Sequence, residues 1–234
     1  MIGQTALWPR AAVFDCDGLL VDSAACWRRA YVTVAREHGR RLDGLDLATL
    51  AGASVATAAA TLSRGLGVRI DEQRLRRALR DSVAACPPPA LPGAAALVHA
   101  LAARMPLAVA SNAPRHIVIG ALEGLCGSAT FDAVVSAEET AAPKPAPDVY
   151  LEACRRLGVA TCDAVAFEDS PVGARAATRA GLLVVGVPSS PAPRLDADLV
   201  VGRLDDPQLL DLLRVRLDHR RRSSRADVRQ ARRA

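Results

Sequence analysis

The chain has 234 residues, a formal net charge of +5 and a 50% share of apolar residues, few of them aromatic, so its core must be built from Ala, Leu and Val. This length is enough for one large domain or for a domain with an insertion. No uninterrupted apolar run reaches the roughly eighteen residues that a membrane-spanning helix needs, and the six cysteines are too far apart in the sequence to suggest a zinc site or a redox pair.

The first predicted element is a short strand over residues 11–14 that leads directly into Asp15, Asp17 and Gly18. Alternate residues of a strand share a face, so these two carboxylates can converge on one cation, without which they repel each other. We interpret Asp15 as a nucleophile toward phosphorus, with Mg²⁺ reducing its repulsion from a phosphate dianion. Asp17 would protonate the leaving alcohol and later deprotonate the attacking water. Gly18 permits a tight turn where a side chain would block substrate.

Two other interpretations of this stretch are a solvated acidic turn and a calcium-binding loop. The calcium loop is disfavoured because its glycine should come three residues later, and because apolar residues 19–21 follow here. The stretch FDCDGLLVDS, residues 14–23, resembles the first motif of the haloacid dehalogenase-like (HAD) superfamily, in its branch of phosphatases and phosphomutases. The resemblance implies Mg²⁺-dependent chemistry on a phosphorylated substrate.

The next part of the sequence is predicted to be entirely helical. Asp22 or Ser23 can cap the first helix, and the triple proline at residues 87–89 ends the helical part. We expect a small all-helical cap inserted after the first strand. The predicted helices are residues 24–38, 55–66 and 71–85, and the predicted domains are a core of residues 1–23 and 90–217, the cap of residues 24–89, and an Arg-rich tail of residues 218–234.

From residue 93 onward, helices alternate with short apolar runs. Such alternation predicts right-handed crossovers and a parallel sheet covered on both faces, which is a Rossmann-like α/β fold. Ligands of such sheets bind at the carboxyl ends of the strands. The predicted strands are residues 107–110, 133–135, 164–167 and 182–187. One predicted helix follows residue 93 and ends at residue 103, and the other predicted helices are residues 114–125, 147–157 and 171–180.

Polar residues follow the predicted strands and resemble the remaining motifs of the superfamily. Ser111, with Asn112 beside it, resembles the second motif, whose hydroxyl binds a phosphate oxygen. Lys144 resembles the third, whose lysine neutralises the phosphoryl oxygens and the nucleophile. Glu168 and Asp169 resemble the fourth, which supplies the metal ligands. The implied Mg²⁺ ligands are Asp15, the backbone carbonyl of Asp17, Asp169, and Glu168 either directly or through water.

Each of these residues also has an ordinary structural interpretation. Ser111 can cap the helix that follows, and Glu168 and Asp169 can be the acidic start of the helix at residue 171. Lys144 can be a surface lysine, yet it is the single lysine among 30 basic residues. A position that holds lysine in a chain using arginine elsewhere suggests a need for a compact ammonium group.

The residues also separate the branches of the superfamily. Asp17 disfavours a dehalogenase, which lacks this second aspartate, and the cap contains no lysine for a phosphonatase Schiff base. A β-phosphoglucomutase-like isomerase is the main alternative. Its cap histidine and arginine align with Trp27 and Val55 here, which removes what a mutase needs to hold a bisphosphate. We therefore favour a phosphatase, with a non-catalytic phosphate-binding protein as a further alternative.

The cap is expected to close over the site and to admit only small phosphorylated metabolites, such as a sugar phosphate or a phosphoglycolate-like acid. Gly52 and Ser54 in the cap, together with Trp27, would then set selectivity. The segment 214–234 has nine arginines and two aspartates, but no aromatic residue for stacking on bases. We therefore expect no specific nucleic-acid partner and no membrane contact, and a cytoplasmic monomer or homodimer.

Overall fold

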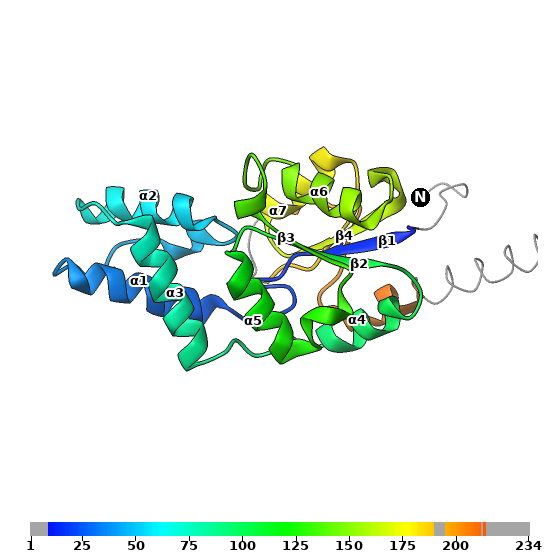
Figure 1. Ribbon diagram of the computed structural model, residues 1–234, viewed down its shortest axis with the longest axis horizontal. Coiled ribbons are helices and arrows are strands. Elements are labelled where there is room, and N and C mark those ends of the chain that lie inside the picture. Colours follow the sequence, from blue (N-terminus) through cyan, green and yellow to red (C-terminus); the bar gives the residue numbers. More distant parts are fainter. Residues whose placement is uncertain (1–8, 190–194, 212, 214–234) are drawn as a thin grey trace, which may run out of the picture.

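A six-stranded parallel sheet forms the centre of the molecule (Figure 1). The structure is a computed structural model that describes residues 9–189, 195–211 and 213, so the predicted Arg-rich tail lies outside the described residues. The strand order is β3-β2-β1-β4-β5-β6, which places β1 and its neighbours in the middle. The strands are β1 (Ala11–Phe14), β2 (Leu107–Ser111), β3 (Ala133–Ser136), β4 (Ala164–Glu168), β5 (Leu183–Gly186) and β6 (Leu199–Val200).

Helices cover both faces of the sheet (Figure 1). On one face, α4 (Ala94–Ala102) and α5 (Arg115–Leu125) pack on a cluster that includes Phe14, whose ring stacks on Phe167 at 4.8 Å between centroids. On the other, α6 (Asp148–Leu157) and α7 (Pro171–Ala180) pack largely through small residues. This arrangement confirms the predicted α/β class, and it explains why polar residues of β2, β3 and β4 stand only at the strand ends, as Ser111, Ser136 and Glu168.

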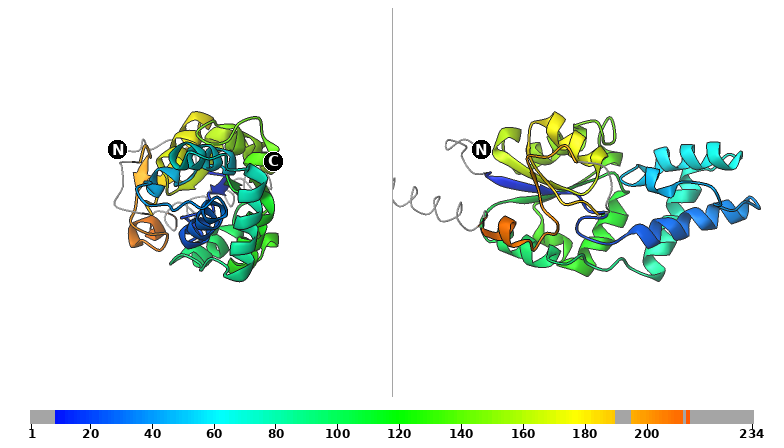
Figure 2. Two further views of the ribbon diagram at one scale, coloured as in Figure 1. Left: turned by 90° about the vertical axis from the view of Figure 1, so that its left-hand side faces the viewer. Right: turned by 180° about the vertical axis from the view of Figure 1, so that it is seen from behind.

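The cap is a separate layer of helices that projects beyond one end of the sheet (Figures 1 and 2). It contains α1 (Ala24–Glu37), the 3₁₀ turn η1 (Leu47–Leu50), α2 (Val55–Leu66) and α3 (Glu72–Ala85). These helices enclose their own apolar cluster, which Ile117 of α5 joins from the core. The two segments that connect cap and core run side by side, with Asp22 N–H donating to the Pro89 carbonyl at 2.9 Å. The cap is thus joined to the core by this connection, and it also packs against α5.

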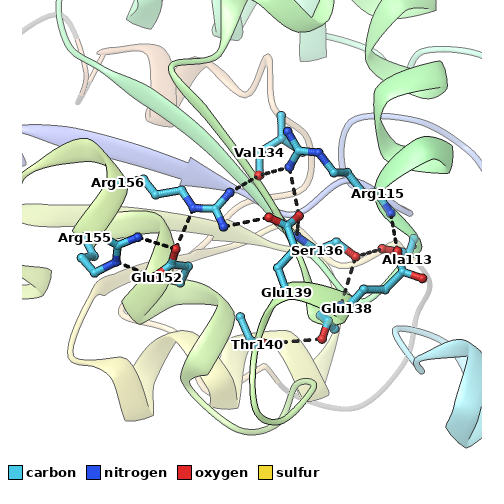
Figure 3. A network of polar contacts seen from close by, with 11 residues as sticks. Ala113, Arg115, Val134, Ser136, Glu138, Glu139, Thr140, Glu152, Arg155 and Arg156 are labelled. Atoms are coloured by element: carbon cyan, nitrogen blue, oxygen red, sulfur yellow. Dashed lines mark hydrogen bonds and ion pairs between the residues drawn. The ribbon is translucent and has the colours of Figure 1, made fainter.

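An ion-pair network lies where the cap meets the core. Arg76 of α3 pairs with Glu138, which stands in the short turn η3 (Ala137–Glu139) after β3. The neighbouring Glu139 accepts from Arg115 at 2.9 Å and from Arg156 at 2.7 Å (Figure 3). Two arginines of the core thus hold the acidic turn η3 in place, and Arg76 of the cap pairs with that turn. Among the described residues, no helix combines the length and apolarity required to cross a bilayer.

Candidate active site

The carboxyl ends of β1, β2 and β4 bring most of the predicted site residues together. Asp15 follows β1, and its N–H donates to the Phe167 carbonyl at 3.0 Å, which places it beside Glu168 at the end of β4. Ser111 ends β2, the other neighbour of β1. Because parallel strands end at the same edge of a sheet, residues more than 150 positions apart in the sequence become neighbours there.

Lys144 lies inside this cluster and is only 5% exposed, which excludes the interpretation as a surface lysine. Its Nζ donates to Asp15 Oδ1 at 2.5 Å and to Glu168 Oε1 at 2.6 Å. Burial disfavours the ammonium form, but the carboxylates of Asp15 and Glu168 outweigh that effect and raise the pKa of Lys144. A permanently charged group therefore lies against the carboxylate of Asp15.

Three carboxylates at this edge can hold a metal ion. Asp15, Glu168 and Asp169 each offer an oxygen, and these oxygens lie within 4.8 Å of one another. Asp169 Oδ1 is buried and has no hydrogen-bond partner among the described residues. Burial raises the pKa of Asp15, although Lys144 opposes this, and burial together with the charge of Glu168 raises the pKa of Asp169 to about 7. An unpartnered oxygen among mutually repelling carboxylates, with oxygen donors only, fits a hard divalent cation such as Mg²⁺.

The position of Gly18 accepts only glycine, because the side chain of Asp169 approaches its backbone closely. Its φ is +85°, and a Cβ built there would lie 2.3 Å from Asp169 Oδ2. No side chain fits in that space, so the residue after Asp17 must be glycine for Asp169 to reach the site. The predicted tight turn is therefore present, and its immediate effect is to make room for a carboxylate.

Glu168 is completely buried and is bound to several protein donors. Its Oε1 accepts from Lys144 and from the hydroxyl of Tyr150, and its Oε2 accepts from the Ser170 hydroxyl at 3.3 Å. Tyr150, whose ring centroid lies 4.9 Å from Lys144 Nζ, was not predicted as a site residue. The only signal in the sequence was a tyrosine on the buried face of the helix that follows Lys144. Glu168 thus acts at least as the anchor of Lys144.

Asp17 faces the first turn of the cap helix α1. Its Oδ1 accepts from Trp27 Nε1 at 3.4 Å, and the Ser23 hydroxyl also bonds to its side chain. Ser23 stands at the N-cap of α1 without a side-chain cap bond, whereas Asp22 Oδ1 accepts from Ala24 N–H at 3.3 Å, so Asp22 is the one of the two predicted caps that bonds to the start of this helix. Burial raises the pKa of Asp17, and the bonds from Ser23 and Trp27 oppose that rise. A carboxyl group with a raised pKa suits an acid that must give up and regain a proton.

Ser111 and Ser54 use their hydroxyls within the protein. The Ser111 hydroxyl accepts from Ala113 N–H at 3.0 Å, while the N-cap of α5 is Pro114, so Ser111 does not cap that helix. The Ser54 hydroxyl caps α2 by accepting from Thr57 N–H at 3.2 Å. Neither arrangement tests the predicted binding of substrate by these two residues.

Asn112 and Gly52, the other two predicted substrate-binding residues, are bonded to each other. Asn112 Nδ2 donates to the Gly52 carbonyl at 2.7 Å. The same amide contacts the backbone of Lys144, with Oδ1 accepting from Lys144 N–H at 2.9 Å and Nδ2 donating to the Lys144 carbonyl at 3.3 Å. The structure therefore brings three parts of the chain into one contact: a cap residue, the residue after β2, and the loop between η3 and α6 that contains Lys144, called the lysine loop from here on.

Comparison with known proteins shows the family to which the chain belongs. A model of the haloacid dehalogenase-like hydrolases matches residues 9–181. The chain belongs to this family of hydrolases, and its relatives identify it more narrowly as a phosphomonoester hydrolase.

Among the relatives, validoxylamine A 7'-phosphate phosphatase of Streptomyces hygroscopicus subsp. limoneus is 33% identical over 216 residues, 90% of this chain and 97% of that protein. Hexitol phosphatase A of Escherichia coli (strain K12) is 32% identical over 209 residues, 82% of this chain and 90% of that protein.

Among solved structures, CbbY from Rhodobacter sphaeroides in complex with phosphate superposes with a TM-score of 0.74 at 26% identity, covering 84% of this chain and 95% of that one. A putative β-phosphoglucomutase from Bacteroides vulgatus has a TM-score of 0.74 at 20% identity, covering 91% of this chain and 92% of that one, a likeness that concerns the fold alone.

Proposed function

We propose that the chain is a Mg²⁺-dependent phosphatase that hydrolyses a small phosphorylated metabolite, a sugar or polyol phosphate or a phosphoglycolate-like acid, through an aspartyl-phosphate on Asp15. The observation that carries this proposal is the convergence of Asp15, Lys144 and the unpartnered oxygen of Asp169 at one edge of the sheet. A nucleophile, a buried cation and a group of carboxylate oxygens that can hold a divalent cation are what transfer of a phosphoryl group to a carboxylate requires.

The metal would be held by side-chain oxygens of Asp15 and Asp169 and by the backbone carbonyl of Asp17, with Glu168 completing the acidic set. When bound, Mg²⁺ supplies positive charge that offsets the repulsion between a carboxylate nucleophile and a phosphate dianion. Lys144 adds a second, fixed positive charge beside Asp15. Together the metal ion and Lys144 would neutralise negative charge on the phosphoryl oxygens of a substrate.

In the reaction, a carboxylate oxygen of Asp15 forms a bond to phosphorus while the bond from phosphorus to the ester oxygen breaks. Asp17 gives its proton to the leaving alkoxide, which departs as an alcohol. The ionised Asp17 then takes a proton from a water molecule that attacks the phosphorus of the aspartyl-phosphate, and inorganic phosphate leaves with Asp15 restored. The raised pKa of Asp17 supports its starting as the acid.

The substrate class follows from the cap and from the relatives. The cap rests on the core at Gly52, which favours a small substrate over a phosphoprotein. The names of three relatives refer to validoxylamine A 7'-phosphate, to fructose 1-phosphate and to a hexitol phosphatase. We therefore place polyol and sugar phosphates first, with Gly52, Ser54 and Trp27 of the cap as the residues that choose among them.

A panel of phosphorylated polyols, sugars and short hydroxy acids tests the proposal by release of inorganic phosphate with Mg²⁺. We expect turnover of at least one member, and loss of it on chelation or with Asp15→Asn. Turnover that survives Asp15→Asn would contradict the mechanism. The absence of turnover on every phosphate would favour a binding protein instead. Conversion of β-glucose 1-phosphate to glucose 6-phosphate with a bisphosphate primer would favour the mutase.

A further inference from the structure

The side chain of Asn112 connects three separate parts of the protein. It is 6% exposed and stands just beyond β2. Its Oδ1 faces an N–H, that of Lys144, whereas its Nδ2 faces two carbonyls, those of Lys144 and Gly52. This donor and acceptor pattern fixes the amide orientation, because the flipped amide would place its oxygen against two carbonyl oxygens.

The contact with Gly52 exists only while the cap rests on the core. Gly52 lies between η1 and α2 in the cap, with a φ of +71°. A Cβ at this position would lie 3.0 Å from the Ser170 hydroxyl oxygen of the core. The cap loop therefore approaches the core more closely than most side chains would allow, and its carbonyl supplies the shortest of the three hydrogen bonds of Asn112.

The contacts with Lys144 hold the lysine loop from its backbone. Asn112 binds both the N–H and the carbonyl of Lys144. The side chain of the same lysine reaches Asp15 and Glu168. Asn112 therefore holds the main chain from which the ammonium group extends, and a shift of this amide would move Lys144 relative to Asp15.

We propose that Asn112 is a positioning residue that couples the docking of the cap at Gly52 to the placement of Lys144. When the cap is docked, the Gly52 carbonyl accepts the shortest hydrogen bond of Asn112 Nδ2. This bond holds the Asn112 amide in the orientation in which it also bonds to the backbone of Lys144. Because coupling between two sites is reciprocal, a phosphate group bound at Lys144 favours the docked cap. This inference rests on the proposed function, since it assumes that Lys144 contacts the phosphoryl group.

A double-mutant cycle of Gly52→Ala and Asn112→Ala tests the coupling. The probe is inorganic phosphate with Mg²⁺, and the readout is its dissociation constant measured by calorimetry, which does not depend on turnover. Asn112→Ala is expected to weaken phosphate binding about tenfold, the effect of about one buried hydrogen bond. Gly52→Ala, which pushes the cap loop off Ser170, is expected to weaken it about threefold or more in the wild-type background and less than about twofold in Asn112→Ala.

Arg80→Ala is the matched control, since Arg80 is a cap residue whose ion pair is with its neighbour Asp81 on the same helix. It should leave phosphate affinity unchanged. Thermal unfolding checks that each variant is folded, and Asn112→Ser replaces Asn112→Ala if the latter does not fold. Equal effects of Gly52→Ala in both backgrounds would overturn the inference while leaving the proposed function intact. A wild-type protein with neither phosphate binding nor turnover would overturn both.

Discussion

At the scale of single residues, the site depends on side chains that share partners. Lys144 and Tyr150 donate to the same oxygen of Glu168, and Lys144 also donates to Asp15. A buried charge is tolerated when such partners surround it. The four motifs, read from the sequence, named Asp15, Lys144, Glu168 and Asp169, but the sequence could not show which donor serves which acceptor. Tyr150 was missed because a buried tyrosine on a helix face has the same pattern as an ordinary core residue.

The bond between Trp27 and Asp17 leads to a prediction about leaving groups. Trp27→Phe keeps an aromatic ring but removes the Nε1–H that holds Asp17. Proton donation matters most for a poor leaving group such as an alkoxide and little for a nitrophenolate. We expect kcat/KM to fall about tenfold for an alkyl phosphate but less than about threefold for a nitrophenyl phosphate. Equal losses on the two substrates would show that Trp27 does not act through Asp17.

At the scale of elements, the bounds of the longer strands could be predicted closely from the sequence. The short strand β6 and the choice of cap for α1 could not. The strands at residues 107, 133 and 164 begin where the apolar runs begin, because a parallel strand covered on both faces is apolar along its buried interior. β6 was missed because two residues, Leu199 and Val200, carry no period, and only pairing with β5 makes them a strand. Of the two predicted caps of α1, Asp22 bonds to the N–H of Ala24, while the Ser23 hydroxyl bonds to Asp17 instead, a choice of partner that the sequence pattern does not contain.

The carboxylates gathered at the strand ends lead to a prediction about pH. Asp15 and Asp169 have raised pKa values in the folded chain, about 7 for Asp169. Without metal, the stability that these groups contribute is present below their unfolded pKa and is lost as pH rises through the folded pKa. Mg²⁺ binds the ionised carboxylates and offsets that loss. We therefore expect Mg²⁺ to raise the Tm more at about pH 8 than at about pH 6.

Thermal unfolding with and without Mg²⁺ at the two pH values measures this difference. Asp169→Asn removes one of the titrating groups and should reduce the dependence on pH. A Tm increase that is the same at both pH values would contradict the assignment of these carboxylates to the metal.

At the scale of the whole molecule, two layers meet at the site, and the cap is held by α5 and by the pair of Arg76 with Glu138. A partly exposed ion pair contributes only about 0–1 kcal/mol and is screened by salt. We expect Arg76→Ala to raise KM about two- to threefold at low ionic strength, with kcat little changed and the difference lost at about 0.5 M salt.

Arg80→Ala again serves as the control, because the ion pair of Arg80 is with Asp81 of the same helix, α3. An equal rise in KM for both variants would mean that Arg76 does not act by holding the cap on the core. A helical cap after the first strand could be predicted from the sequence. The ion pair between Arg76 and Glu138 could not, because it depends on how the folded cap packs against the folded core.

The central claim is that Asp15 carries the phosphoryl group during turnover. Acid quenching of the enzyme during turnover with its best substrate, followed by mass spectrometry of the peptide that contains Asp15, tests this most directly. We expect a phosphorylated Asp15 that appears within the first turnover and is absent from Asp15→Asn. Rapid turnover with no phosphorylated peptide at any time, or with the phosphoryl group on another residue, would contradict it.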